Sequence, residues 1–410
     1  MDACRNRIRS LITARTLKGC VIVAGLSLAA TGVSTSGGAS SGASTPGAST
    51  LAVPYADLPG WADDRHQDAF EVFVRSCRQP AALRAGLPAP PALARACEAA
   101  LSLSPSGHDA ARRFFERWFT PFRITPRTPE GETSSGFLTG YFEPEYPGSL
   151  ARSADFQTPL YGRPADLVTL DAGTIIPGLP TGFQAARRMP DGRLLAYPDR
   201  RDIDMGGAAQ GWPVIAWLRD HVDRFVMQVQ GSARLRLPDG SVKRIAYAGR
   251  NGHPYVSLGR LLSQAEKIPP ADMTMDRLVA RLKSDAEWGK AFIWNNPSFV
   301  FFRLADELDP QDGPIGGAGV PLTAHRSIAA DRGIWPYGLP VWLDGTIPVQ
   351  ERGKTERLQR LSIIQDTGSA IVGAARFDLF YGSGPDAGFV AGLTRHNVEA
   401  TILWPHENAR

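Results

Sequence analysis

Glycine and proline interrupt this chain so often that they limit its fold more than any other feature. The 410 residues include 42 Gly and 33 Pro, and both residue types break helices and mark turns. Coiled coils and long helical bundles are therefore excluded. Between such turns, the carboxy-terminal third holds short segments rich in β-branched and aromatic residues: 298–303, 339–344, 360–366 and 376–381. Short strands in this arrangement predict a small β-barrel.

The amino-terminal segment predicts an export signal. Five basic residues lie between Arg5 and Lys18, and an apolar run follows from Gly19 to Val33. We therefore expect a signal peptide over residues 1–35. An uncleaved anchor is the alternative, but the run is shorter than the roughly 20 residues that span a bilayer. The next segment, 36–54, is rich in Ser, Gly, Thr and Ala and predicts a flexible linker.

Export and removal of the signal would change the net charge of the chain and the oxidation state expected for its cysteines. The formal net charge of +4 falls to zero when the first 40 residues are removed, so we expect no nucleic-acid partner. Cys20 lies at the start of the apolar run instead of following it, and we expect no lipid anchor. Cys77 and Cys97 are the only cysteines beyond the signal, and in an oxidising compartment they predict a disulfide. Two buried free thiols are the alternative.

Hydrophobic spacing predicts helices first and strands afterwards. Apolar residues recur at helical spacing within 70–77, 93–101 and 111–118. Residues 136–142 and 224–230 then have the composition of strands.

A hairpin is the next element that the pattern predicts. Residues 233–237 and 242–247 alternate on either side of Asp239-Gly240, a dipeptide that supplies the positive φ angles of a tight turn. One helix, with Thr274 as its N-cap, is expected before the last strands.

Three common kinds of catalytic site are missing from the sequence. The seven histidines are scattered, and no two have the i, i+4 spacing of a metal-binding helix. No G-x-S-x-G motif lies between a strand and a helix, as a serine hydrolase requires. Residues 382–387 formally match a dinucleotide fingerprint, but Pro385 and Gly388 oppose the helix that must follow. We expect no metal and no cofactor.

Three aspartates near the carboxy terminus are candidates for acid–base chemistry. Asp378 lies between Phe377 and Leu379 in a predicted strand, where Asp is rare. Burial there would raise its pKa above about 4 and let it act as a general acid near neutral pH. An outward-facing Asp378 is the alternative. Asp331 and Asp366 precede Arg-Gly and Thr-Gly pairs, where turn capping is the simpler explanation.

Aromatic and amide side chains favour a long, uncharged, polar polymer as ligand. Core packing explains most of the aromatic residues equally well. The residues concerned are Tyr141, Phe142, Trp335, Tyr337, Trp342, Gln228, Gln230, Ser232 and Asn251.

The strongest pattern in the sequence is a set of seven segments: GFLTGYFEPEY, DIDMGGAAQGWPV, MQVQGSARLRLPDG, YAGRNGHPYVSLG, NPSFVFF, GVPLTAHRSIAADRGIWPYGLP and QDTGSAIVGAARFDLFYGSGPDAG. Together they resemble the membrane-bound lytic murein transglycosylase A family. They follow one another in the family's order between about residues 55 and 405, and the last one, with Asp331, resembles the 3D domain, named for three aspartates. Two features depart from the family: the lipid-modified cysteine is missing, and Ser369 stands where the family has glycine.

The resemblance implies a mainly β fold with amino-terminal helices. Its parts are a double-ψ β-barrel, an inserted second β-rich domain and a glycan cleft between them. We expect the helical part and first barrel strand over 55–142, the inserted β domain over 143–270, and a helix with the double-ψ barrel over 271–410.

The resemblance also implies an activity: non-hydrolytic cleavage of the β-1,4 bond between N-acetylmuramic acid and N-acetylglucosamine in peptidoglycan, which leaves 1,6-anhydromuramoyl ends. Carried over by position, Asp378 is the catalytic acid and then base, with Asp366 and Asp331 as its neighbours. One carboxyl group suffices because the nucleophile is a hydroxyl of the substrate itself. The expected substrate-binding residues are Thr139, Tyr141, Gln228, Gln230, Gly231, Ser232, Gln365 and Gly368.

Glycan strands of peptidoglycan are the expected partner, with other cell-wall enzymes as further candidates. We expect an exported protein of the periplasm, associated with the outer membrane or the cell wall. Two other functions stay open. An inverting glycoside hydrolase would use Asp366 or Asp331 to prepare a water molecule, and a glycan-binding module would not cut at all.

Overall fold

The computed structural model describes residues 46–79, 87–103, 107–128, 131–132, 135–170, 174–179, 182–206 and 211–406. The predicted signal peptide and most of the predicted linker lie outside these residues. The described chain is mainly β with some helices. None of its described helices has both the length and the apolar character needed to cross a bilayer.

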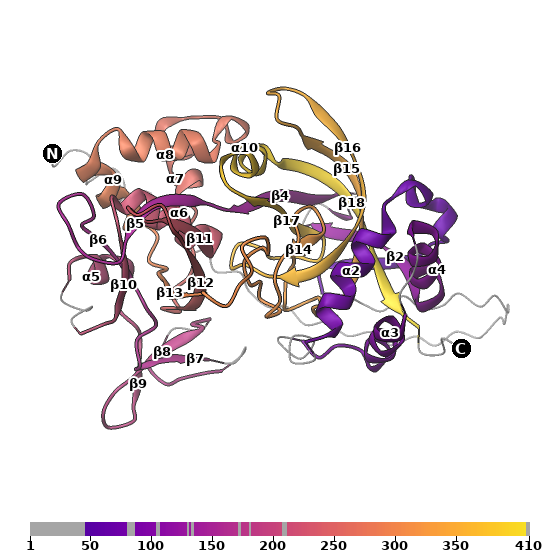
Figure 1. Ribbon diagram of the computed structural model, residues 1–410, viewed down its shortest axis with the longest axis horizontal. Helices are drawn as coiled ribbons and strands as arrows, with labels where there is room; N and C mark the ends of the chain where they lie inside the picture. Colours follow the sequence, from indigo (N-terminus) through magenta and orange to yellow (C-terminus); the bar gives the residue numbers. More distant parts are fainter. Residues whose placement is uncertain are drawn as a thin grey trace, which may run out of the picture. The chain divides into compact units, whose positions relative to one another are not determined.

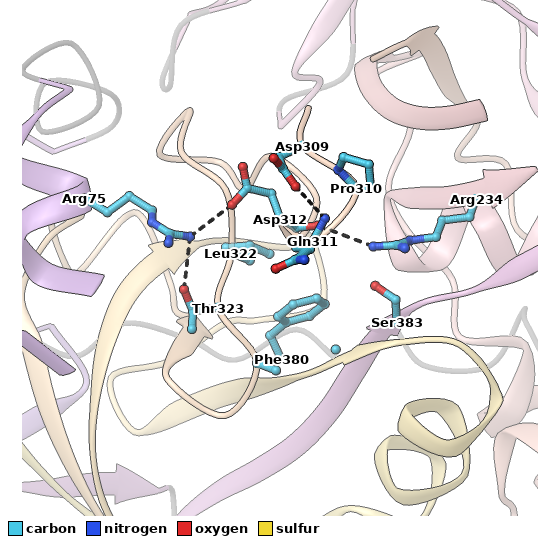
Figure 2. A pocket seen from close by; sticks show the side chains of 13 residues that line it. Arg75, Arg234, Asp309, Pro310, Gln311, Asp312, Leu322, Thr323, Phe380 and Ser383 are labelled. Carbon is cyan, nitrogen blue, oxygen red and sulfur yellow. Dashed lines mark hydrogen bonds and ion pairs between the residues drawn. The ribbon is translucent and has the colours of Figure 1, made fainter. Parts of the chain in front are cut away.

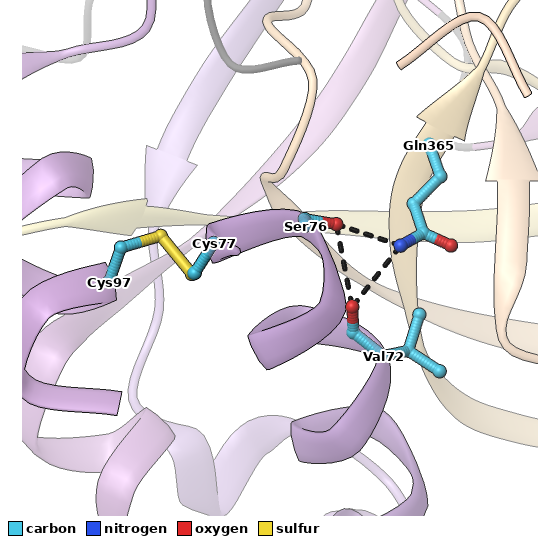
Figure 3. Close-up of a disulfide and its surroundings, with 5 residues drawn as sticks. All are labelled: Val72, Ser76, Cys77, Cys97 and Gln365. Atoms are coloured by element: carbon cyan, nitrogen blue, oxygen red, sulfur yellow. Dashed lines mark hydrogen bonds between the residues drawn. A yellow bond between two sulfur atoms is a disulfide. The ribbon is translucent and has the colours of Figure 1, made fainter. Parts of the chain in front are cut away.

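The three predicted amino-terminal helices form. They are α2 (His66–Cys77), α3 (Pro91–Ser102) and α4 (His108–Trp118), and their apolar faces share one hydrophobic core with the carboxy-terminal strands. A disulfide between Cys77 and Cys97 joins α2 to α3 (Figure 3). Part of the predicted linker is ordered, because β1 (Ala48–Ala52) pairs with β2 (Phe119–Thr128).

Six strands form a closed barrel. In order around the ring, β18, β15, β16, β14, β17 and β4 pair with their neighbours, and β4 pairs with β18. The pairs β14–β16 and β4–β17 are parallel. Figure 1 shows magenta β4 among the orange and yellow strands of the carboxy-terminal third. The strands are β4 (Gly136–Glu143), β14 (Ser327–Ala329), β15 (Pro340–Pro348), β16 (Thr355–Asp366), β17 (Arg376–Ser383) and β18 (Arg395–Pro405).

A second, six-stranded sheet has the order β13-β12-β11-β5-β10-β6. Because β13 pairs with β12, this sheet includes a strand from beyond residue 270, where we expected the insert to end. The strands are β5 (Glu145–Ser149), β6 (Thr158–Tyr161), β10 (Val214–Leu218), β11 (Ser232–Arg236), β12 (Val242–Arg250) and β13 (Val300–Leu304).

Smaller elements complete the described chain. The strand β3 (Gly131–Glu132) pairs with β2, and a third sheet contains β7 (Leu167–Thr169), β8 (Ala185–Arg188) and β9 (Leu194–Leu195). The remaining helices are α5 (Arg200–Asp204), α6 (His221–Gln230), α7 (Leu258–Glu266), α8 (Met275–Lys283), α9 (Ala286–Ile293) and α10 (Pro385–Leu393).

Three local predictions are wrong. Residues 224–230 belong to helix α6, which Asp220 caps by accepting a hydrogen bond from the Asp223 amide and which Gly231 ends at a φ of 82°. Pro385 does not prevent a helix, because it occupies the first turn of α10, where its missing N–H is not needed. In the hairpin turn, Gly240 has a positive φ and Asp239 does not.

Other predictions at this level are confirmed. The hairpin strands are β11 and β12, and the Thr274 side chain caps α8 by accepting a hydrogen bond from the Arg277 amide. The helices α7 and α9 were not predicted, although Asp285 caps α9 in the same way.

Candidate active site

The barrel register brings two of the three candidate aspartates onto one face. Thr139 pairs with Asp378, Asp378 pairs with Ala329, and Ala329 pairs with Asp366. Paired residues on neighbouring strands present their side chains on the same face. Since neighbouring strands lie about 4.8 Å apart, two strand spacings separate the aspartates by roughly 10 Å between Cα atoms.

Strand alternation explains why Asp378 lies on this face. Phe377 and Leu379 are both fully buried in the main core, so the residue between them points the other way. A small apolar cluster contributes to the same face as the half-buried Asp378, because Ala329 is the strand partner of Asp378, and Tyr141 and Phe380 lie two residues beyond Thr139 and Asp378. Its members are Tyr141, Leu322, Ala329, Ile371 and Phe380.

The Asp378 carboxyl is held by a short chain of hydrogen bonds. The Thr139 hydroxyl donates to Asp378 Oδ1 at 2.7 Å, and Arg376 Nη2 donates to Thr139 Oγ1 at 2.8 Å. Burial raises the pKa of Asp378 to about 6, and the Asp366 charge adds to the rise, while Arg376 and the Thr139 hydroxyl oppose it. A substantial fraction of Asp378 is therefore protonated in mildly acidic solution, as a general acid requires.

Asp366 has both carboxyl oxygens occupied. Oδ1 accepts hydrogen bonds from the amides of Gly317 at 2.8 Å and Thr367 at 2.9 Å, and Oδ2 accepts one from the Tyr141 hydroxyl at 2.9 Å. Burial raises the pKa of Asp366, and these three hydrogen bonds oppose the rise. Asp366 thus fixes Tyr141 and two loops beside Asp378.

Asp331 caps turns, which is the simpler of the two roles considered from the sequence. Its Oδ1 accepts a hydrogen bond from the Gly333 amide at 2.9 Å, and its Oδ2 accepts one from the Gly373 amide at 2.8 Å. Neither bond reaches Asp366 or Asp378. Asp331 therefore ties the loop after β14 to the loop before β17.

Two glutamines expected to bind substrate have both ends of their amide groups hydrogen-bonded within the protein. Gln228 is buried in α6, where its Oε1 accepts a hydrogen bond from Arg200 and its Nε2 donates to the Val300 carbonyl at 2.9 Å. Gln365 is buried too. It donates to Ser76 Oγ at 2.7 Å and accepts from Ser327 Oγ at 2.6 Å, which ties α2 to the barrel (Figure 3).

The other expected binding residues lie in varied positions. Gln230 accepts a hydrogen bond from the Phe142 amide at 3.0 Å, Gly231 ends α6, and Ser232 is buried at the start of β11. Gly368 lies exposed in the turn after β16, where its carbonyl accepts from the Ile371 amide at 2.9 Å. Thr139 and Tyr141 are the two that contact the aspartates.

Aromatic residues considered as sugar platforms are mostly core residues. Trp335, Tyr337 and Trp342 are each at most 3% exposed and belong to the main core. Asn251 is buried and bonded to the Pro198 and Pro297 carbonyls.

The sequence reasoning missed Arg376 and Glu143. Arg376 lies two residues before Asp378 on β17, so strand alternation alone would have placed both side chains on one face. Glu143 ends β4 with no exposed surface and accepts hydrogen bonds from Arg234, Arg244 and Ser383. No described group of three or more His, Cys, Asp or Glu side chains is arranged to hold a metal ion.

Comparisons with known proteins agree with this architecture. A family model described as the MltA specific insert domain matches residues 137–303, and one described as the 3D domain matches residues 326–404. The chain is 33% identical over 294 residues to membrane-bound lytic murein transglycosylase A of Escherichia coli (strain K12), an alignment that covers 69% of this chain and 70% of that protein.

The chain is also similar to solved structures of such proteins. A membrane-bound lytic murein transglycosylase from Agrobacterium tumefaciens has a TM-score of 0.76 at 34% identity, over 87% of this chain and 97% of that one. MltA from Neisseria gonorrhoeae, in a monoclinic form, has a TM-score of 0.72 at 30% identity, over 91% and 96% respectively.

Proposed function

The chain belongs to the membrane-bound lytic murein transglycosylase A family, and from this premise we propose that it is a peptidoglycan lytic transglycosylase. Its substrate is the β-1,4 bond between N-acetylmuramic acid and N-acetylglucosamine, and its product carries a 1,6-anhydromuramoyl end. The observation that carries the proposal is Asp378, a half-buried carboxyl with a pKa raised to about 6.

In the first step, the protonated Asp378 carboxyl donates its proton to the glycosidic oxygen. The bond between that oxygen and C1 of the muramoyl unit breaks, N-acetylglucosamine leaves as an alcohol, and an oxocarbenium-like centre develops at C1. The raised pKa of Asp378 supplies the proton in mildly acidic to near-neutral solution.

In the second step, the oxygen of the muramoyl C6 hydroxyl attacks C1 and closes the anhydro ring. Its proton returns to the Asp378 carboxylate, so the enzyme ends in its starting state and no water is consumed. Because the nucleophile is part of the substrate, positioning replaces the second catalytic group of a hydrolase.

The hydrogen bonds of the other two aspartates support a single acid–base group. A hydrolase of the inverting kind needs a free carboxylate to deprotonate water. Asp366 is engaged by Gly317, Thr367 and Tyr141, and Asp331 is engaged by Gly333 and Gly373. We assign them the role of holding the loops and Tyr141 around Asp378.

Thr139 is a positioning residue for Asp378 in this proposal. Its hydroxyl donates to Oδ1, which fixes the carboxyl rotamer and leaves Oδ2 for the substrate. Arg376 fixes the Thr139 hydroxyl in turn.

The finer features of the fold and its setting are part of the same proposal. The parallel pairs β14–β16 and β4–β17 within the closed ring support a double-ψ barrel, with the glycan in a cleft between barrel and insert. The relatives are named membrane-bound, which supports an exported protein that acts in the periplasm at the outer membrane or cell wall. Other cell-wall enzymes are its candidate partners.

The test is digestion of purified sacculi by the Asp378→Asn variant. We expect at least about a thousandfold loss of soluble products, in line with the loss of an acid–base group, with binding to sacculi retained. Asp344→Asn is the matched control, since Asp344 of β15 pairs with the exposed Arg357 of β16. Full activity in Asp378→Asn would overturn the mechanism, and sacculi bound but uncut by the unmodified protein would indicate a binding module.

A further inference from the structure

A large cavity lies beside β17, the strand that carries Asp378, and the proposed chemistry does not use this cavity. Its volume is about 900 Å³, and its walls come from α2, β11, β17 and the loop 309–313 (Figure 2). Phe380 and Gly382 line it, and Phe380 shares the β17 face of Asp378, because alternate strand residues point the same way. The Phe380 ring also packs on Tyr141, with centroids 5.3 Å apart, and Tyr141 donates to Asp366.

Two arginines enter the cavity from opposite sides (Figure 2). The Arg75 side chain of α2 is 39% exposed, lies 3.6 Å from Asp312 Oδ1 and donates to Thr323 Oγ1 at 3.3 Å. Arg234 of β11 is anchored through Nε to the buried Glu143 at 2.7 Å, and its Nη2 donates to the Asp312 carbonyl at 3.3 Å. Both guanidinium groups are thus held in place with donors left over.

A carboxylate without a cation lies between them. Asp309 is exposed, and its Oδ1 accepts a hydrogen bond from the Gln311 amide at 2.9 Å. Among the residues that the structure describes, no Lys or Arg side chain forms an ion pair with it. Below the charged loop, Leu322 and Phe380 give the cavity an apolar floor.

This combination suits a zwitterionic peptide better than a sugar. An uncharged sugar is bound by neutral hydrogen-bonding groups and aromatic faces, whereas guanidinium groups and a free carboxylate match carboxylates and an ammonium group. Resting on the proposed function, we propose that the cavity binds the peptide stem attached to the muramoyl unit. Arg75 and Arg234 contact the stem carboxylates, Asp309 contacts the free amine of its diamino acid, and the floor contacts its alkyl parts.

Binding of the free stem tests the cavity without catalysis. A synthetic stem tetrapeptide, and the same peptide with its side-chain amine acetylated, are titrated calorimetrically into the full Asp378→Asn protein. We expect Arg75→Gln to raise the Kd of both peptides about fivefold, and Asp309→Asn to raise only that of the free amine. Arg65→Gln is the control, because Arg65 is 72% exposed in an ion pair with Asp68. No binding, or equal Kd values in all variants, would overturn the proposal.

Turnover separates this inference from the proposed function. The ratio of kcat/KM on stem-bearing glycan strands to that on strands stripped by an amidase is compared between variants. We expect the ratio to fall about fivefold in Arg75→Gln and to hold in Arg65→Gln. If both substrates are cleaved and this ratio is the same in all variants, the stem site is contradicted and the proposed function is not. Cleavage of neither contradicts the proposed function, and the peptide titration still decides the cavity.

Discussion

The pKa of Asp378 is set by surroundings that act in opposite directions. Burial and the Asp366 charge raise its pKa, and Arg376 and the Thr139 hydroxyl lower it, with a balance at about 6. From the sequence, a raised pKa is one of two hypotheses, because an aspartate within a strand is either buried or faces outward. The opposing partners could not be predicted, since Thr139 is 239 positions away in the chain.

Replacing Thr139 by Val is expected to make Asp378 a weaker acid. The Thr139 hydroxyl stabilises the charged carboxylate, so its loss raises the pKa of Asp378. The falling limb of the kcat/KM profile, which lies near pH 6 when Asp378 must be protonated, then moves up by about one pH unit or less. Thr139→Ser keeps the donor and serves as the control. A limb that moves down, or does not move, contradicts this account of Asp378.

The same burial predicts an activity–stability trade-off. The folded pKa of Asp378 exceeds the unfolded value of 3.8, so the folded state binds protons more tightly and stability falls as pH rises from about 4 through 6. Asn cannot ionise. Asp378→Asn should therefore gain about 2–3 kcal/mol relative to the unmodified protein between pH 4 and pH 7, as measured by urea unfolding. If the stability difference between the variant and the unmodified protein does not change with pH, burial does not raise the pKa of Asp378.

Gln228 and Gln365 show what the residue pattern could not reveal. Amides next to a predicted groove favour sugar binding when only the sequence is known. Their partners, Arg200 for Gln228 and Ser76 with Ser327 for Gln365, come from distant segments. In the folded protein, the amide groups of both glutamines are hydrogen-bonded to these partners, as buried polar groups generally are.

At the scale of elements, helix α6 shows where hydrophobic periodicity fails to predict the secondary structure. The stretch Arg224–Gln230 is short and largely apolar, and periodicity alone does not separate strand from helix in such a run. The cap at Asp220 and the glycine at position 231 were the available signals. The strands β15, β16 and β17 were predicted because Gly and Pro turns enclose them on both sides.

The disulfide is the element-scale feature with the clearest energetic consequence. Cys77 and Cys97 are 20 positions apart, and a crosslink of that span stabilises a fold by about 3 kcal/mol through the unfolded chain. The double variant Cys77→Ala, Cys97→Ala should lose that amount in urea unfolding. Reduction of the unmodified protein is the control, and it should give a similar loss. A loss in the variant without a loss on reduction would assign the effect to packing instead.

At the scale of the molecule, one strand both closes the barrel and links it to the second sheet. β4 closes the ring against β17 and β18 and ends at Glu143, which binds Arg234 and Arg244 of the second sheet and Ser383 of β17. The sequence predicted β4 and the barrel strands, but the link through Glu143 depends on residues about 90 to 240 positions away.

Glu143→Gln should therefore destabilise the protein by about 3 kcal/mol, because two guanidinium groups lose the anion they share. Glu145→Gln is the matched control, since Glu145 pairs with exposed Arg236 and its loss should cost less than about 1 kcal/mol. Thermal unfolding at constant pH compares the two. Equal effects would mean that Glu143 does not link barrel and insert.

The proposed reaction cuts glycan without consuming water, and one digestion tests this most directly. The protein is incubated with sacculi in water labelled with oxygen-18, and the new muramoyl ends are analysed by mass spectrometry before and after borohydride reduction. We predict ends that are one water lighter than hydrolysed ends, resist reduction and carry no label. Reducible ends that carry the label would contradict the account and give a second carboxylate the role of base.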